Sequence, residues 1–522
     1  MDAEKYCSRN SHIKQSDIAI VSILILAFAL RIAWLVCTNL TAEDAFITFQ
    51  YARRISQGAG FVYNLGEKIC GTTTPLFSLL LALWISVFGE GTVVLGARLY
   101  SFAASISSLF FLVLSLRFLG FTTVQQGFAL SLLVIWPKLW GIDTSGMETS
   151  LVVFLITVSW YTYLTKRNIW TGVLLGLLLW TRIDALNWVL LMIGFQYFRN
   201  PKESIKTLSA AVLTFSPWLI FALFYFGSPI PYTIHAKQIA YSKFNTVPFY
   251  SHFFTLIKKL GPVNSLSFPG NFTGLAAILT YFILILAIAA SYISRKNRNI
   301  LLLFVFSISE LLLLTFTKAT FTGRYLIPAL YFFLFFAGLL LGKIWEKIKT
   351  SLPLKSLFAL VVTGMFLYIL SLGVIEAEIM RNLQLYNHEK SLKRIGEWLN
   401  ENTDQDATVM LEPLGYAGYY ADRRMLDVVG LITPPVVDLK DQGLLNPYEY
   451  IPSLAPDYLV VHCDDILRWL EQEQDNNTRH LDGYRKVITI NPLDFDPTNT
   501  AVELTMDLVL SRNACYEIWE SQ

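Results

Sequence analysis

Charged residues are scarce in this sequence. They make up 15% of its 522 residues, whereas about a quarter of the residues of a soluble domain are charged. Neither sign dominates, because 41 Lys and Arg face 39 Asp and Glu. The net charge of +2 is uninformative, since the distribution of Lys and Arg matters more than the sum. We expect no nucleic acid among the partners. The mean hydropathy of +0.48 instead indicates a protein of the lipid bilayer.

Two kinds of short motif are also missing. The five cysteines form no CxxC pair and the six histidines form no HExxH motif, which argues against a structural zinc site. No cleavage site of small residues follows the first long apolar run. We therefore interpret Ile18–Cys37 as a retained membrane helix and not as a signal peptide.

Long apolar runs dominate the first two thirds of the chain. Runs of about 20 apolar residues recur between Ile18 and Leu372, and each is about long enough to cross a hydrocarbon core of ~30 Å. Sequence of mixed polarity follows. We predict a polytopic α-helical membrane domain over residues 1–375 and a water-soluble domain over residues 376–522. The eleven predicted spans cover roughly residues 18–37, 93–116, 123–141, 149–165, 170–182, 184–198, 207–226, 273–294, 299–317, 323–345 and 354–373.

The apolar segment Pro75–Phe88 decides the topology, because it is short for a span. If it crossed the membrane, the later basic loops would face outward. If it lies in the membrane interface, the clusters of Lys and Arg fall on one side, in agreement with the positive-inside rule. We therefore expect a cytoplasmic N-terminus and an extracytoplasmic C-terminal domain. The outer loops are then Thr38–Thr74, Gly141–Thr149 and Gly227–Gly270.

An acidic pair, Glu43–Asp44, lies in the first outer loop. It directly precedes the amphipathic stretch Ala45–Ile55, which we expect to lie along the membrane. Carboxylates near the N-terminus of a helix are stabilised by the helix dipole and stay ionised. An ionised carboxylate can take a proton from a sugar hydroxyl as a general base. The plainer alternative is a helix N-cap with a solvated charge.

Four more ionisable residues occur near the outer face. Asp143 and Glu148 lie in the second outer loop, where they are either functional or part of an ordinary polar loop. Ionisable groups at membrane depth are costly and tend to mark function. Arg182 and Asp184 lie at the junction of two short spans, where they could bind substrate or simply neutralise each other.

Two basic residues suit an anionic ligand. Lys237 lies in the third outer loop, and Arg324 lies at the outer mouth of a span. A guanidinium can hold a phosphate through two parallel hydrogen bonds. Both side chains could instead extend to the membrane interface without binding any ligand.

The C-terminal region has the pattern of a small α/β domain. ATVMLEP and PDYLVVHC have the composition of short buried strands, and HEKSLKRIGEWLNENT has helical spacing. Such a domain could bind the acceptor of a reaction or form a rigid cover over the outer cavity. We favour the cover.

Four cysteines fall on the outer side of this topology, and Cys7 on the inner side. An oxidising compartment permits two disulfides among the four. The favoured pairs are Cys37 with Cys70 and Cys463 with Cys515. Cys37 could instead lie inside the membrane, which would leave both thiols of the first pair free.

Several longer motifs follow one another along the chain. They are EDAFITFQYARRISQGAGFVYNLGE, GTTTPLFSLLLA, SGMETSL, TRIDAL, GSPIPYTIHAK, GRYLIPAL and GYAGYYADRRMLDVVGLITPPVV. Over residues 18–465 this pattern resembles polytopic glycosyltransferases of the GT-C fold, in particular the branch of mycobacterial terminal arabinofuranosyltransferases and their bacterial relatives. Two segments depart from that branch. Glu43–Asp44 replaces its usual pair of aspartates, and Gly71–Thr74 lacks a tyrosine that often occurs there.

The resemblance implies inverting transfer of a sugar, with arabinofuranose as a candidate. The donor would be a polyprenyl-phosphate sugar, and the acceptor a cell-envelope glycan or glycolipid at the outer face of a bacterial plasma membrane. Asp44 would be the catalytic base. A polyprenyl phosphate is already a fair leaving group, so a divalent metal is optional and no cofactor is predicted. The predicted substrate-binding residues are Glu43, Asp143, Glu148, Arg182, Asp184, Lys237, Arg324 and Tyr325.

Two other functions are compatible with a polytopic chain. One is a transporter or flippase for lipid-linked sugars, and the other is a non-catalytic scaffold of envelope assembly. Transporters usually contain internal repeats and broken helices, and this sequence shows no such repeat. Its acidic residues cluster at one outer face and not at mid-membrane. The glycosyltransferase is therefore the favoured hypothesis.

Overall fold

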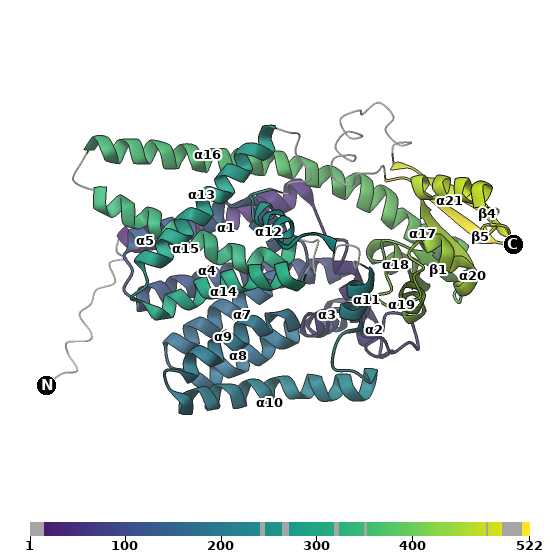
Figure 1. The fold of residues 1–522 in the computed structure, drawn as a ribbon, viewed down its shortest axis with the longest axis horizontal. Helices are drawn as coiled ribbons and strands as arrows, with labels where there is room; N and C mark the ends of the chain where they lie inside the picture. Colours follow the sequence, from purple (N-terminus) through teal and green to yellow (C-terminus); the bar gives the residue numbers. More distant parts are fainter. Residues whose placement is uncertain are drawn as a thin grey trace.

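The structure is a computed structural model, and it describes residues 15–240, 246–263, 271–317, 323–348, 352–476, 479–492 and 514–522. Cys7 lies outside these residues. A bundle of helices forms most of the molecule, and the strands and helices of the C-terminal region form an α/β unit at one end of it (Figure 1). The long helix α16 runs along the bundle and leads into the α/β unit (Figure 1).

Seven helices of the described residues are long and apolar enough to cross a membrane. Each corresponds to one of the predicted spans, and their outward faces carry many exposed large apolar side chains, such as Leu213, Phe224 and Leu360. Such faces suit lipid and not water. The chain is therefore an integral membrane protein. The seven helices are α1 (Gln15–Thr38), α4 (Val93–Phe118), α10 (Pro201–Phe226), α13 (Asn271–Ile293), α14 (Arg298–Thr317), α15 (Ile327–Lys347) and α16 (Leu352–Asn382).

The other four predicted spans correspond to shorter helices. The span predicted at 123–141 is wrong as one continuous helix, because it breaks at Trp136 into two helices. Trp136 precedes Pro137 and has an extended ψ of 109°, as the proline ring requires of the residue before it. The second of these helices is bent by 105° relative to the next, so the described residues hold seven spans, or eight if that pair counts as one. The short helices are α5 (Thr123–Ile135), α6 (Pro137–Thr144), α7 (Thr149–Leu164), α8 (Asn168–Thr181) and α9 (Leu186–Tyr197).

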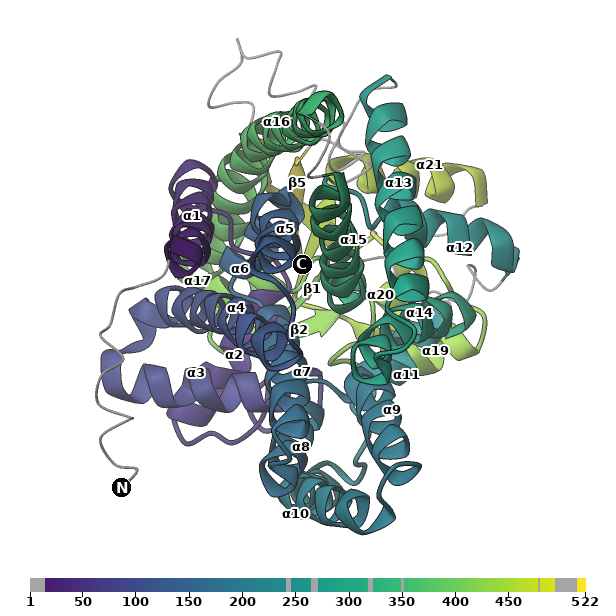
Figure 2. The same cartoon turned by 90° about the vertical axis from the view of Figure 1, so that its left-hand side faces the viewer.

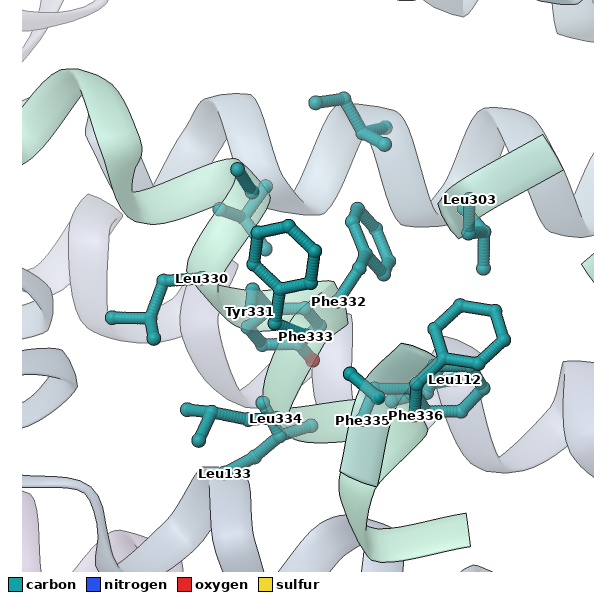
Figure 3. Packing of buried hydrophobic residues seen from close by; sticks show 14 of the residues in the cluster. Leu112, Leu133, Leu303, Leu330, Tyr331, Phe332, Phe333, Leu334, Phe335 and Phe336 are labelled. Carbon is teal, nitrogen blue, oxygen red and sulfur yellow. The ribbon is translucent and has the colours of Figure 1, made fainter. Parts of the chain in front are cut away.

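Helix α15 is the centre of the bundle. Every residue from Ile327 to Gly342 is buried, as expected for a helix that is apolar on all sides. Close packing against α5 depends on two glycines. A Cβ at Gly338 would lie 2.5 Å from the Ala129 Cα, and one at Gly342 would lie 2.6 Å from the Gln125 Cα. Small residues of this kind let membrane helices approach closely. Figure 2 shows neighbouring helices around α15, and Figure 3 shows its aromatic side chains within the core.

The first outer loop contributes two helices, α2 (Ala45–Ser56) and α3 (Pro75–Phe88). The α2 helix is almost completely buried, because it packs between α3 and the α18 helix of the α/β unit. Ala45–Ile55 therefore packs mainly against protein, and its orientation along the membrane stays a prediction. The α3 helix spans about 21 Å at 1.5 Å per residue, which is too short to cross the membrane unaided. Two further short helices, α11 (Tyr232–Ala240) and α12 (Phe249–Lys258), follow α10.

The α/β unit contains a five-stranded sheet with the strand order β2-β1-β3-β5-β4. The strands β2, β1 and β3 are parallel, whereas β5 is antiparallel to β3 and β4. Two strands, β1 and β3, form where the sequence predicted them. The strands are β1 (Thr408–Leu411), β2 (Arg424–Asp427), β3 (Tyr458–His462), β4 (Tyr484–Ile490) and β5 (Tyr516–Ser521), and the helices are α17 (Arg394–Asn402), α18 (Gly415–Ala421), α19 (Pro434–Asp441), α20 (Ile451–Leu454) and α21 (Cys463–Asn476). A π-helical segment, Leu383–Lys393, connects α16 to α17.

One of the two predicted disulfides is confirmed. Cys463 and Cys515 form a disulfide with their Cα atoms 5.5 Å apart, and it joins the start of α21 to the residue before β5. The pairing of Cys37 with Cys70 is wrong. Cys37 is exposed at the end of α1, whereas the Cys70 thiol is buried and donates to the Thr72 carbonyl.

We expect the Cys463–Cys515 disulfide to stabilise the α/β unit. It closes a sequence separation of 52 residues, which corresponds to about 4 kcal/mol in the chain-entropy treatment. Alkylation without reductant, followed by mass spectrometry, should modify Cys37 and leave Cys463 and Cys515 unmodified. Cys463→Ser should lower the thermal stability of the α/β unit, whereas Cys37→Ser should not. Alkylation of Cys463 in the folded, unreduced protein would contradict the pairing.

Candidate active site

A cavity of about 180 Å³ lies between the helical bundle and the α/β unit. Residues of the first outer loop form one side, and the bend between α6 and α7, the α11 helix and the turn Gly323–Leu326 before α15 form others. The loops that follow β1 and β2 complete the wall. The lining residues are Glu43, Asp44, Ile47, Thr48, Gly71, Thr72, Thr73, Thr74, Met147, Glu148, Thr233, Lys237, Arg324, Tyr325, Glu412, Pro413, Leu414, Asp427, Val429 and Leu431.

Asp44 and Arg324 form an ion pair in this cavity, with 2.7 Å between the carboxylate Oδ2 and the guanidinium Nη1. Burial alone would raise the pKa of Asp44, but the charges of Arg324 and Lys237 outweigh burial and lower it. Asp44 is therefore ionised at neutral pH. About 38% of its side chain is exposed, so a ligand in the cavity can reach the carboxylate. The position of Asp44 before α2 agrees with the predicted N-cap, but its side chain makes no capping hydrogen bond.

Arg324 also keeps a hydrogen-bond donor for a further ligand. Its Nε–H has no partner among the described residues, although the group is buried. Lys237, on α11, lines the same cavity and forms no ion pair with any residue that the structure describes. Lys237 and Arg324, two of the predicted cationic residues, therefore lie on the same cavity as Asp44 and can meet an anion there.

Glu43 has the opposite protonation state to its neighbour. Burial, and then the charge of Asp44, raise its pKa to about 8. The backbone N–H of Gly415, at the start of α18, donates to the Glu43 carboxyl group. A Cβ at position 415 would lie 2.1 Å from the Glu43 carbonyl oxygen, so this contact requires glycine. Glu43 thus joins the first outer loop to the α/β unit as a neutral group at pH 7.

Arg182 lies behind the cavity wall and is held by two carboxylates. It donates to Asp184 at 2.9 Å and to Glu148 at 3.3 Å, so the predicted mutual neutralisation with Asp184 is present. Its guanidinium also lies 4.2 Å from the centre of the Tyr325 ring, in cation–π geometry. Glu148 lines the cavity, and its Oε2 has no hydrogen-bond partner among the described residues. Arg182 and Asp184 therefore position Glu148 and Tyr325 without lining the cavity themselves.

Asp143 lies outside the cavity, contrary to its prediction as a substrate-binding residue. Its carboxylate accepts hydrogen bonds from Arg31 at 2.7 Å, from Ser105 at 2.6 Å and from Ser150 at 2.7 Å. All four side chains are buried within the bundle. A buried carboxylate must be compensated in this way, and the Asp143–Arg31 pair connects α6 to α1. Asp143 therefore joins α6 to α1, α4 and α7 inside the bundle.

The α/β unit supplies cavity residues that the sequence analysis missed. Glu412 follows β1 directly, and Asp427 ends β2. The buried Asp427 carboxylate accepts hydrogen bonds from the backbone N–H groups of Val429, Leu431 and Ile432, so it shapes the loop that lines the cavity. Burial raises the pKa of Asp427. A charged residue at the end of a short apolar strand was the available signal, because the carboxyl ends of parallel strands commonly form sites.

The described part of the chain contains no preformed metal-binding site. No three His, Cys, Asp or Glu side chains there lie close enough to hold a metal ion together. The metal-free site stays a prediction.

Comparison with known proteins gives one family match and several structural ones. Residues 378–517 match a family described as Domain of unknown function (DUF8728), which covers the end of α16, the π-helical segment and most of the α/β unit. No curated protein matches the chain.

Two crystal structures of ArnT from Cupriavidus metallidurans are similar to this structure. The apo structure gives a TM-score of 0.58 at 11% identity and covers 87% of this chain and 94% of ArnT. The structure bound to undecaprenyl phosphate gives 0.57 at 9% identity and covers 96% and 97%. The likeness confirms the fold that the resemblance predicted. The chain has the GT-C fold of ArnT. Its place in the arabinofuranosyltransferase branch stays a prediction.

Proposed function

We propose that this protein is an inverting glycosyltransferase that uses a polyprenyl-phosphate sugar as donor. One observation carries the proposal: an ionised, accessible carboxylate at Asp44 shares a cavity with Arg324 and Lys237. A base beside two cations suits a reaction in which a hydroxyl loses a proton and a phosphate departs.

The proposed reaction is a single displacement. Asp44 takes the proton of an acceptor hydroxyl, whose oxygen forms a bond to the anomeric carbon of the sugar. The bond from that carbon to the phosphate oxygen breaks on the opposite face, so the configuration inverts and a polyprenyl phosphate leaves. Arg324 and Lys237 stabilise the negative charge of the leaving group. The phosphate competes with Asp44 for Arg324, which frees the carboxylate for the proton.

The fold supports the choice of donor. One of the similar ArnT structures is bound to undecaprenyl phosphate, and the present chain shares that fold over most of its length. The sequence resemblance adds arabinofuranose as the candidate sugar and a cell-envelope glycan or glycolipid as the acceptor. We place the reaction at the outer face of a bacterial plasma membrane, with the N-terminus in the cytoplasm and the α/β unit outside.

An assay of bond formation tests the proposal. Purified protein in detergent is incubated with a panel of radiolabelled polyprenyl-phosphate sugars and with membrane acceptors. Because a detergent solution has no two sides, a transporter or flippase gives no product in this assay. Labelled acceptor supports the enzyme, and the absence of product with every donor contradicts it.

Asp44→Asn should lower the transfer rate by about two to four orders of magnitude, the usual range for loss of a general base. Glu43→Gln is the matched control, because Glu43 is neutral at pH 7 and glutamine retains the oxygen that accepts from Gly415. We expect that control to keep its activity within about tenfold of the wild type. Equal losses in both variants would remove Asp44 from the role of base.

The raised pKa of Glu43 predicts a pH-dependent stability. An unfolded glutamate ionises near pH 4.5, whereas the folded protein holds the proton of Glu43 up to a pKa of about 8. The folded state therefore binds more protons between these values, and the free energy of unfolding should fall as the pH rises through this window. Thermal unfolding of wild type and Glu43→Gln from pH 5 to pH 9 measures the effect. Parallel curves for the two proteins would show that Glu43 does not hold the proton.

Arg324→Ala should raise the KM for the donor by about 10- to 100-fold, because it removes a charge-assisted contact with phosphate. Arg324→Lys should recover only part of this loss, since an ammonium lacks the planar guanidinium fork. Arg381→Ala, at an exposed arginine of α16, is the control for removing a positive charge. An unchanged donor KM in Arg324→Ala would leave Arg324 with a structural role alone.

A further inference from the structure

A second cavity, of about 550 Å³, lies beside the first in the α/β unit. The two cavities share Glu43, Glu412 and Pro413 in their walls. The proposed reaction uses only the first cavity. The second has the volume of a typical small-molecule site.

The strand order places this second cavity at a topological switch point of the sheet, where α/β proteins commonly bind ligands. In the order β2-β1-β3, the chain passes from β1 to β2 on one side and then crosses to β3 on the other. Open α/β sheets bind ligands at such switch points, outside the carboxyl ends of the strands. Glu412 directly follows β1, His462 ends β3 and Asp465 lies three residues further, and all three line the cavity.

A buried polar atom in the wall lacks a partner. Asn387, in the π-helical segment, lines the second cavity and is 7% exposed, and its Oδ1 has no hydrogen-bond partner among the described residues. Leaving a buried acceptor unsatisfied is costly, so this oxygen is suited to a ligand hydroxyl. The neighbouring wall includes the buried aromatic residue Trp469, and Tyr516. Such rings can pack against the apolar face of a sugar.

The charge of the wall restricts the ligand. The ionisable acids Glu43, Glu412 and Asp465 line the second cavity, and no Lys or Arg does so among the described residues. Asp465 is already paired with Arg468 at 3.3 Å, so this wall offers a phosphate no cationic side chain among the described residues. The first cavity, by contrast, contains Arg324 and Lys237. The two neighbouring cavities therefore suit different chemistry, an anionic phosphate in the first and a neutral, hydroxyl-rich group in the second.

We infer that the second cavity is the acceptor subsite, which binds uncharged sugar residues of the acceptor glycan. This inference rests on the proposed function, since it assigns the acceptor side of the same reaction. An acceptor bound there extends past the shared wall at Glu43 and Glu412, and its terminal hydroxyl enters the first cavity beside Asp44. Asn387 accepts a hydrogen bond from one of its hydroxyls.

Calorimetric titration of the full-length protein in lipid nanodiscs, free of glycoside detergents, tests the inference. The probes are neutral arabinose, mannose, galactose and glucose trisaccharides, mannose 6-phosphate, and undecaprenyl phosphate. We expect at least one neutral trisaccharide to bind and mannose 6-phosphate not to bind. Asn387→Ala should weaken trisaccharide binding about tenfold, the effect of losing a buried hydrogen bond. Asn402→Ala, at an exposed asparagine of α17, is the matched control.

Undecaprenyl phosphate separates a local effect from misfolding. Asn387→Ala should bind it as well as the wild type does, whereas Arg324→Ala should lose affinity for it and keep the trisaccharide. Trp469→Phe gives a second, milder change in the same wall and should also weaken the trisaccharide alone. The inference is wrong if no trisaccharide binds, or if both wall variants bind it as the wild type does. If trisaccharides bind as expected but no donor supports transfer, the proposed enzyme activity fails and the sugar subsite stands.

Discussion

Two adjacent carboxyl groups connect the parts of this protein. Asp44 pairs with Arg324 at the start of the central helix region, and Glu43 accepts a hydrogen bond from Gly415 of the α/β unit. The same two positions therefore attach the first outer loop to the bundle on one side and to the α/β unit on the other. Arg324 lies beside Asp44 and lowers its pKa, so Asp44 stays ionised. Glu43 instead holds its proton. Neighbours in the chain thus have different chemistry.

The position of Arg324 depends on the packing of α15. This helix follows Arg324 almost immediately and is buried on every side, so the arginine is presented at a fixed point of the bundle. Close approach at Gly338 fixes α15 against α5. On the other side of the cavity, Arg182 is fixed by Asp184 and Glu148 and lies against the Tyr325 ring. A rigid wall of this kind is what electrostatic stabilisation of a departing phosphate requires, since its charges need no rearrangement during reaction.

Under the proposed function, the first cavity takes the polar lipid donor and the second takes the sugar acceptor. Carboxyl groups line both cavities, which share Glu43 and Glu412, but among the described residues Lys237 and Arg324 line the first cavity and no Lys or Arg lines the second. The α/β unit is then more than a cover, because its strand ends supply walls to both cavities. This arrangement also accounts for the buried contacts of α2, which lies between the bundle and the α/β unit and carries Asp44 at its start.

The sequence alone, through its hydropathy and short motifs, predicted the long apolar helices and the strands β1 and β3. It also predicted the candidate site residues Asp44, Lys237 and Arg324. These features depend on composition and spacing within one segment, which a sequence displays directly. Tertiary structure decided that Glu148 faces the cavity while Asp143 pairs with Arg31, although both lie in one short loop. It also decided the protonation of Glu43 and the place of Glu412 and Asn387, because burial and charge at a side chain depend on residues brought together from distant parts of the chain.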